Sequence, residues 1–256
     1  LFEIVPIGMY HKVRKKQRLK TTNKTTNKIA NAQQTMSSRL QGGLTMLKLM
    51  DCTLRDGGNV VGKGFDAEIT TIVLDILTES GVDYIEVGNS GGIGAYEVAG
   101  FTNALKDDEY LALVQPYLNK SSSQIGMFLN ATRYRPNNDI PKAAKAGLKF
   151  IRVGCEAGKG AIAVDVIKEI KACGMQAFYS AMKAYLLSPE ELVEEAKMLA
   201  EAGLDEYTIM DSAGCMRPEE AAEYTKLLKE ALDIPVAFHC HNNLGLSAAN
   251  DLASYH

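Results

Sequence analysis

The sequence lacks long apolar runs, paired cysteines and a general excess of basic residues. No apolar stretch approaches the roughly 20 residues that a membrane-spanning helix needs. The five cysteines are scattered, without CxxC pairs or the density of a disulfide scaffold. We therefore expect free thiols, a reducing compartment, a cytoplasmic location and no membrane-spanning segment.

Basic residues are scarce outside the first 45 positions. Residues 1–45 contain nine Lys and Arg against one acidic residue, whereas the remaining chain contains nineteen against thirty. Because recognition of nucleic-acid phosphates needs a basic face, we do not expect a nucleic-acid partner for the body of the protein. The 256 residues suffice for one α/β barrel of about 250 residues, and small-molecule chemistry is the favoured function.

Residues 1–45 form a basic leader that is rich in Lys, Thr, Asn and Gln and has no sustained apolar period. This composition predicts disorder. An organelle-targeting peptide is one interpretation, but the leader begins with Leu1 and its helical amphipathicity is poor. We favour the alternative that the native chain starts at Met46, so the catalytic domain is expected over residues 46–256.

From Met46 onward, a unit recurs in which an amphipathic helix is followed by a Gly-containing turn and a short apolar strand. Before four strands the unit has nearly the same form: SGVDYIEVG, AGLKFIRVG, CGMQAFYS and AGLDEYTIMD. Helices are predicted between the strands, for example over 189–202, with Ser188 as N-cap before a proline. The predicted strands are 47–52, 83–87, 124–129, 149–153, 176–180, 206–210 and 236–240.

Alternating strands and helices without hairpin turns predict a parallel sheet. A (β/α)8 TIM barrel and an open, doubly wound sheet both satisfy this pattern. The seven strands are one fewer than the closed barrel needs, and the sequence stops at His256, so a barrel would be truncated after strand 7. We favour the barrel, because polar residues cluster at the carboxyl ends of several strands, the rim where barrel enzymes place their chemistry.

The segment FHCHNNLGLSAAN, at 238–250, carries two histidines at alternate positions of a strand end. Side chains at i and i+2 share one face of a strand, so His239 and His241 can converge on one metal ion, while Cys240 should face the helices. Two merely packed or exposed histidines are the alternative. The metal is favoured because the pair is half of the four histidines in the chain and precedes a Gly-containing turn.

The segment LMDCTLRDGGN, at 49–59, delivers two opposite charges to the end of an apolar strand. Asp56 can add an oxygen ligand to the same ion, and Arg55 can hold a carboxylate or a developing enolate oxygen. A structural surface pair of Arg55 with Asp56 is the alternative. Two histidines and one carboxylate fit Mn²⁺, Mg²⁺, Fe²⁺ or Zn²⁺, and we favour Mn²⁺ or Mg²⁺.

Four motifs follow one another along the chain: DCTLRDG at 51–57, IEVG at 85–88, DSAG at 211–214 and HCHNNLGLSAAN at 239–250. Together they resemble the metal-dependent aldolase and acyltransferase barrels that include 3-hydroxy-3-methylglutaryl-CoA lyase and 2-isopropylmalate synthase. Within this group the sequence is most similar to the 4-hydroxy-2-oxovalerate aldolases, through GIGAYEVAGF, SPEEL and DSAGCM. The resemblance extends from about Met46 to the end of the sequence.

The resemblance implies a lyase that cleaves a 4-hydroxy-2-oxo acid to pyruvate and an aldehyde through a metal-stabilised enolate. It implies that Arg55 stabilises the enolate oxygen, that Glu86 orients Arg55, and that Ser212 contacts the substrate carboxylate beside His239. An aldehyde dehydrogenase partner or a homo-oligomer is also implied. The implied metal ligands are Asp56, His239 and His241.

Two positions depart from the family pattern. The aldolases have a histidine base three residues after the metal-binding Asp, where this chain has Asn59, and a His-Gly pair after the second strand, where it has Asn89 and Ser90. An amide cannot accept a proton at neutral pH. Our candidate base is Lys183, at the end of the fifth strand, whose pKa a nearby metal would lower; a solvated rim lysine is the alternative, and Tyr185 is a weaker candidate base.

Two other functions remain open at this point. The same scaffold supports a Claisen-type acyltransferase that joins acetyl-CoA to a 2-oxo acid, as in the 2-isopropylmalate and homocitrate synthases. The replaced histidine base suggests, alternatively, a catalytically inactive barrel. Pyruvate release in the absence of coenzyme A would separate the aldolase from the acyltransferase.

Overall fold

The computed structural model describes residues 47–255, so the predicted leader and the domain boundary at residue 45 lie outside the described residues. The described chain contains one parallel sheet, in which each strand pairs with the next along the sequence. The strands are β1 (Met50–Asp51), β2 (Tyr84–Glu86), β3 (Gln124–Asn130), β4 (Phe150–Glu156), β5 (Gln176–Met182), β6 (Glu206–Asp211) and β7 (Val236–Cys240).

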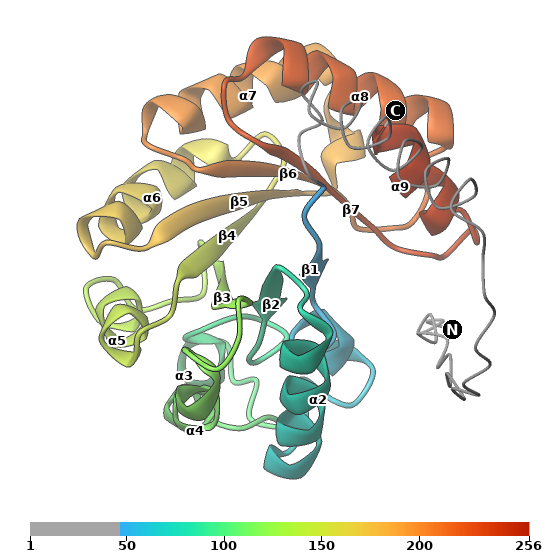
Figure 1. Cartoon of the computed structure of the whole chain (residues 1–256). Coiled ribbons are helices and arrows are strands. Elements are labelled where there is room, and N and C mark those ends of the chain that lie inside the picture. The colour runs from blue at the N-terminus through green and yellow to red at the C-terminus, as the bar shows by residue number, and fades with distance from the viewer. Residues whose placement is uncertain (1–46, 256) are drawn as a thin grey trace, which may run out of the picture. The chain divides into compact units, whose positions relative to one another are not determined.

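Helices follow the strands and lie outside the sheet (Figure 1). Helix α7 begins as predicted, because Ser188 Oγ accepts from the backbone N–H of Glu191 and the Glu191 carboxylate accepts from that of Ser188. In residues 47–255 no helix is both long and apolar enough to cross a membrane. The helices are α2 (Ala67–Ser80), α3 (Ala95–Val98), α4 (Asp107–Val114), α5 (Asp139–Ala146), α6 (Ala163–Ala172), α7 (Pro189–Glu201), α8 (Pro218–Ala231) and α9 (Ser247–Tyr255).

The first and last strands of the sheet carry side chains that meet. Asp56, just after β1, lies 3.3 Å from His239 in β7 and 3.0 Å from His241 beyond it, measured from Oδ2 to each Nε2. Because β1 and β7 stand at opposite ends of the strand order, the sheet must curl to bring them together. The described residues therefore form seven of the eight units of a (β/α)8 TIM barrel, as predicted, and not an open doubly wound sheet.

The predicted strands differ from the structure mainly at their ends. Strand β1 is shorter than predicted at both ends. At its carboxyl end, the Asp51 carboxylate accepts from the backbone N–H and hydroxyl of Thr53 and turns the chain out of the sheet. Strands β4 and β5 are longer than predicted, because they pair with each other as far as Glu156 and Met182. The added residues carry the chain to the rim, where the loops begin.

The inside of the sheet is filled by an aromatic layer below a charged one. Tyr84, Phe150 and Phe178 pack together with ring centroids 4.9–5.6 Å apart. Two positions further along β2 and β4, on the same face, stand Glu86 and Arg152. The aromatic layer thus closes the inside from below and excludes water from the charged layer.

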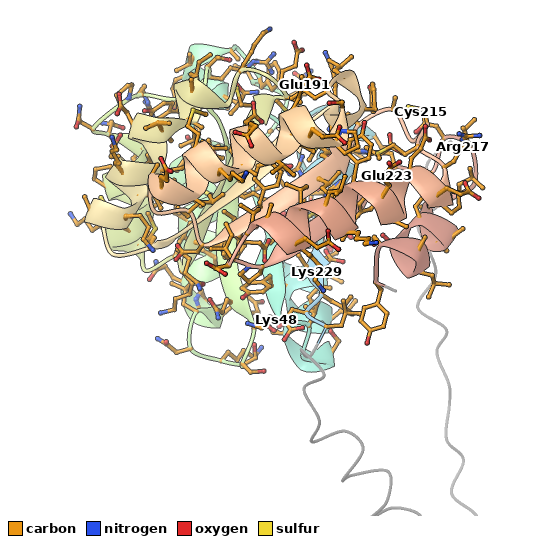
Figure 2. The ribbon with its side chains drawn as sticks, turned by 90° about the horizontal axis from the view of Figure 1, so that it is seen from above. Lys48, Glu191, Cys215, Arg217, Glu223 and Lys229 are labelled. Atoms are coloured by element: carbon orange, nitrogen blue, oxygen red, sulfur yellow. The ribbon has the colours of Figure 1, made fainter. Side chains whose placement is uncertain are left out.

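The loops after the strands gather at one end of the sheet, as in other barrels. Figure 2 shows Cys215 and Arg217, which follow β6, at the start of α8, with Glu223 further along the helix and Lys229 in its last turn. The carboxyl ends of the strands, and with them the charged residues, lie at the end where α8 begins.

Candidate active site

The turn after β1 builds the first part of the site. The backbone N–H groups of Arg55 and Asp56 both donate to the carbonyl oxygen of Cys52, at 3.1 and 2.8 Å. Asp56 then begins a short 3-10 helix, η1 (Asp56–Asn59). The Arg55 side chain is buried, whereas 21% of the Asp56 side-chain surface is exposed. The Asp56 carboxylate therefore lies where a ligand can reach it.

The two histidines face this carboxylate from the end of β7. The His241 Nδ1 atom lies 2.7 Å from the carbonyl oxygen of Asp211. A carbonyl only accepts, so Nδ1 carries a proton, and in the neutral ring the lone pair of Nε2 faces Asp56 Oδ2. Two acceptor atoms 3.0 Å apart need a cation between them, either a proton or a metal ion.

The site fits a divalent metal ion. One ligand atom from each of Asp56, His239 and His241 lies within 4.8 Å of the others. Among the His, Cys, Asp and Glu side chains of residues 47–255, these three form the one group that is close enough together to share a metal ion. Imidazole nitrogens and a carboxylate suit such an ion. The Asp211 carbonyl also orients His241 as outer partners orient metal-binding histidines.

Burial and neighbouring charges shift the pKa values of the three residues. Burial raises the pKa of Asp56, but hydrogen bonds with both histidines and the charge of Arg55 outweigh it, so the pKa lies well below its usual range. Burial, aided by Arg152, lowers the pKa of His239 to about 4. The hydrogen bond with Asp56 raises the pKa of His241. At neutral pH, Asp56 is therefore ionised and His239 neutral, the forms that bind a metal.

A buried carboxylate holds two arginines beside the metal ligands. Glu86 accepts from Arg55 Nε and, with both its oxygens, from Arg152, at 2.6 and 2.7 Å. Burial raises the pKa of Glu86, but the two arginines lower it to about 2. Arg55 Nη1 donates to Asp56 at 2.8 Å. The contact predicted between Glu86 and Arg55 is present, and Glu86 also binds Arg152, which the sequence analysis did not assign to the site.

One nitrogen atom of the Arg55 guanidinium remains free to donate to a ligand. Its Nη2 atom is buried and has no partner among the described residues. Its guanidinium carbon lies 4.6 Å from the centre of the Phe128 ring, which supports the group from one side. A Cβ at Gly154 would overlap this ring, so glycine leaves room for Phe128. The unpartnered donor is thus held rigidly next to the metal ligands.

Lys183 and Ser212 lie on the rim between β4 and β6. The Lys183 ammonium donates to Glu156 at 2.7 Å, and its backbone N–H donates to Ser212 Oγ at 2.9 Å. The hydrogen bond to Glu156 raises the pKa of Lys183. The expected lowering depended on a bound metal ion, whereas the carboxylate of Glu156 on the neighbouring strand acts in the opposite direction. A lowering by the metal stays a prediction. The base role of Lys183 and the substrate contact of Ser212 stay predictions.

The two amides in place of family histidines have structural partners. Asn59 Nδ2 lies 3.1 Å from the backbone oxygen of Asp56 and 3.2 Å from its Oδ1 atom. Asn89 donates to the backbone oxygen of Phe101 and accepts from the N–H of Gly91. Asn59 thus steadies the Asp56 carboxylate, and Asn89 closes the loop after β2.

Cys240 faces away from the metal site, as predicted. Its Sγ lies 3.1 Å from the Asp251 carboxylate and 3.4 Å from the Ser247 backbone oxygen, both in α9. Arg152, by contrast, was missed. An arginine inside the predicted apolar strand 149–153 needs a buried partner with the opposite charge. This requirement is the signal by which Arg152 could have been recognised.

Comparison with known proteins assigns the family. The family model described as HMGL-like matches residues 46–256. The chain belongs to the HMGL-like family. The 4-hydroxy-2-oxovalerate aldolase of Carboxydothermus hydrogenoformans is 36% identical over 208 residues, which are 81% of this chain and 61% of that protein. The aldolase of the same name from Pelotomaculum thermopropionicum is 35% identical, over 81% of this chain and 60% of its own. This HMGL-like chain spans about three fifths of these curated relatives.

Solved structures support the same fold for this HMGL-like chain. The N-terminal domain of a Bacteroides vulgatus protein superposes with a TM-score of 0.67 at 24% identity, over 81% of this chain and 69% of that one. The carboxyl transferase domain from Rhizobium etli pyruvate carboxylase gives a TM-score of 0.68 at 19% identity, over 90% and 41% of the two chains. At these identities the likeness establishes the fold alone.

Proposed function

We propose that the chain carries the catalytic domain of a divalent-metal-dependent aldolase, which cleaves a 4-hydroxy-2-oxo acid to pyruvate and an aldehyde. The observation that carries the proposal is the convergence of Asp56, His239 and His241 beside the unpartnered donor of Arg55. The names of the curated relatives support the same substrate class. The aldehyde dehydrogenase partner, the homo-oligomer and the cytoplasmic location stay predictions.

The charges of the site favour a substrate that gains negative charge. Arg55 and Arg152 carry two positive charges, which Glu86 and Asp56 balance. A divalent cation, when bound, supplies the Lewis acid that polarises the 2-oxo group; Mn²⁺ or Mg²⁺ is our proposal for it. The bound site would then have a net positive charge among partly buried side chains, which stabilises an enolate.

The residues of the chain divide the remaining work. In the cleavage, a base takes the proton of the C4 hydroxyl, the C3–C4 bond breaks, the aldehyde leaves and the electron pair remains as the pyruvate enolate. Arg55 Nη2 would donate to the enolate oxygen, and Ser212 would contact the carboxylate. Lys183 stays the proposed base for the C4 hydroxyl, although its raised pKa opposes this role.

Replacing one metal ligand tests the proposal. We expect Asp56→Asn to reduce Mn²⁺ affinity and the release of pyruvate from 4-hydroxy-2-oxo acids by at least 100-fold, because an amide lacks the ligand charge. Titration calorimetry would measure the metal, and lactate dehydrogenase would report pyruvate. Asp165→Asn is the matched control, since that side chain is 97% exposed.

Three outcomes would contradict the proposal. Mn²⁺ binding that survives Asp56→Asn would remove this residue from the ligand set. Turnover that occurs only when coenzyme A is supplied would favour the acyltransferase. Metal binding without turnover of any 4-hydroxy-2-oxo acid would favour the inactive barrel.

A further inference from the structure

Lys63 is held rigidly at the end of the loop that carries the metal-binding carboxylate. Its backbone N–H donates to the carbonyl oxygen of Gly58 at 2.7 Å, and its own carbonyl accepts from the N–H of Ser90 at 2.8 Å. Its φ is 106°, a value rare for a residue with a side chain. Such strain persists only where several contacts impose it, and it concentrates at functional sites.

The Lys63 side chain is directed back toward the metal ligands. Its Nζ atom lies 3.4 Å from Asn59 Oδ1, and the amide nitrogen of the same Asn59 lies 3.2 Å from Asp56 Oδ1. The ammonium is therefore joined to a metal ligand through one side chain. Nζ also lies 4.9 Å from the centre of the Phe101 ring. An amide oxygen and an aromatic face both suit an ammonium group.

Other ionisable groups near the site are engaged or unreactive. Glu86 is held by two arginines. Burial raises the pKa of the Cys52 thiol to about 12. Lys183 is paired with Glu156 at 2.7 Å. Lys63 has neither a carboxylate partner nor a short hydrogen bond in the contacts found for it, so its proton can be transferred without breaking an ion pair.

We propose that Lys63 is a catalytic residue that moves the proton at C3 of pyruvate, an inference that rests on the proposed aldolase function. An N–H bond of the ammonium breaks and a C3–H bond forms with the electron pair of the enolate. The C2 carbonyl re-forms, and Lys63 is left as an amine that regains a proton from water. In the reverse direction, the amine takes a C3 proton and the pair becomes the enolate that Arg55 holds.

The experiment follows exchange of the pyruvate methyl protons in D₂O by NMR, with Mn²⁺ removed before acquisition. This half-reaction needs no knowledge of the aldehyde. We expect Lys63→Met to slow exchange at least 100-fold, the range of general acid–base catalysis, with Mn²⁺ affinity unchanged within twofold. Added ethylamine should restore part of the rate in Lys63→Met, because it supplies the missing group.

The matched control is Lys106→Met, since Lys106 also places its ammonium over an aromatic ring, 5.9 Å from the centre of Tyr96, but lies in a different segment. It should exchange at the parent rate. If Lys63→Met exchanges the methyl protons at the parent rate, the inference is overturned but the proposed function is not. The same holds if its exchange rate falls, ethylamine does not restore the rate, and Mn²⁺ binding is also weakened. A parent protein that binds Mn²⁺ but neither exchanges pyruvate nor cleaves oxo acids would overturn the proposed function, and the role of Lys63 with it.

Discussion

Arg152 lies next to the proposed metal ligands, with its Nη1 atom 3.4 Å from His239 Nδ1. It holds Glu86 through two hydrogen bonds, and Glu86 holds Arg55. We expect Arg152→Met to destabilise the fold by about 3–5 kcal/mol, because it leaves a buried cluster with one unbalanced negative charge. Urea unfolding measures this loss. Arg152→Lys keeps the charge and should cost less; an equal loss for both variants would show that packing, and not charge, is decisive.

The sequence predicted side chains whose position follows from strand periodicity. His239 and His241 alternate along one strand, so their common face needed no tertiary information. The position of Lys63 near the site was not predicted, because it depends on backbone hydrogen bonds that join Lys63 to Gly58 and to Ser90. The ion pair of Lys183 with Glu156 was not predicted for a similar reason, since this carboxylate comes from another strand.

At the scale of elements, helix α4 begins with a carboxylate in an unfavourable environment. Asp107 is buried and accepts from the N–H of Gly94 at 2.8 Å. Burial, together with Glu97 and Asp139 and against the charge of Arg135, raises its pKa to about 6. A raised pKa means that the folded state binds the extra proton between about pH 4 and 6, so ionisation costs stability as the pH rises through this window.

We therefore expect Asp107→Asn to be more stable than the parent at pH 7, by up to about 3 kcal/mol, with the difference vanishing near pH 4. The amide oxygen can still accept from Gly94. Chemical unfolding at several pH values gives the difference between the two proteins. Asp108→Asn, in the same turn but with 74% of its side chain exposed, should show no such pH dependence. A gain for Asp107→Asn that is independent of pH would contradict the assignment.

Local sequence signals decide where α7 begins and where β1 ends, but only the first of the two was predicted. The start of helix α7 is indicated by Ser188, a proline and Glu191, which lie within four consecutive residues. The end of strand β1 has a signal that is equally local, but the prediction did not use it. Its last residue is decided by the hydrogen bonds of Asp51 with Thr53, and side chains of this kind compete with the sheet for the backbone.

At the scale of the whole sheet, the alternation of strands and helices predicted parallel strands, but not by itself the curl. The barrel was favoured because polar residues cluster at the carboxyl ends of several strands. The candidate ligand set of Asp56 and the two histidines points the same way, since it requires β1 to approach β7. In the structure these side chains lie within 3.3 Å. The residue types thus indicated that the first and last strands come close together. The apolar periodicity of the sequence contains no information about that contact.

This geometry makes metal binding a property of the whole fold. The proposed ligands come from the two ends of the strand order, so a bound ion would tie β1 to β7 and bind the folded state in preference to the unfolded chain. At a Mn²⁺ concentration 100 times its Kd, we expect about 2.7 kcal/mol of added stability, which corresponds to a rise in Tm of roughly 5–10 °C for a domain of this size. Differential scanning calorimetry measures the shift, and Asp56→Asn should abolish it. An equal shift in Asp56→Asn would mean that Mn²⁺ stabilises the protein elsewhere, because only a ligand set that includes Asp56 joins the first strand to the last.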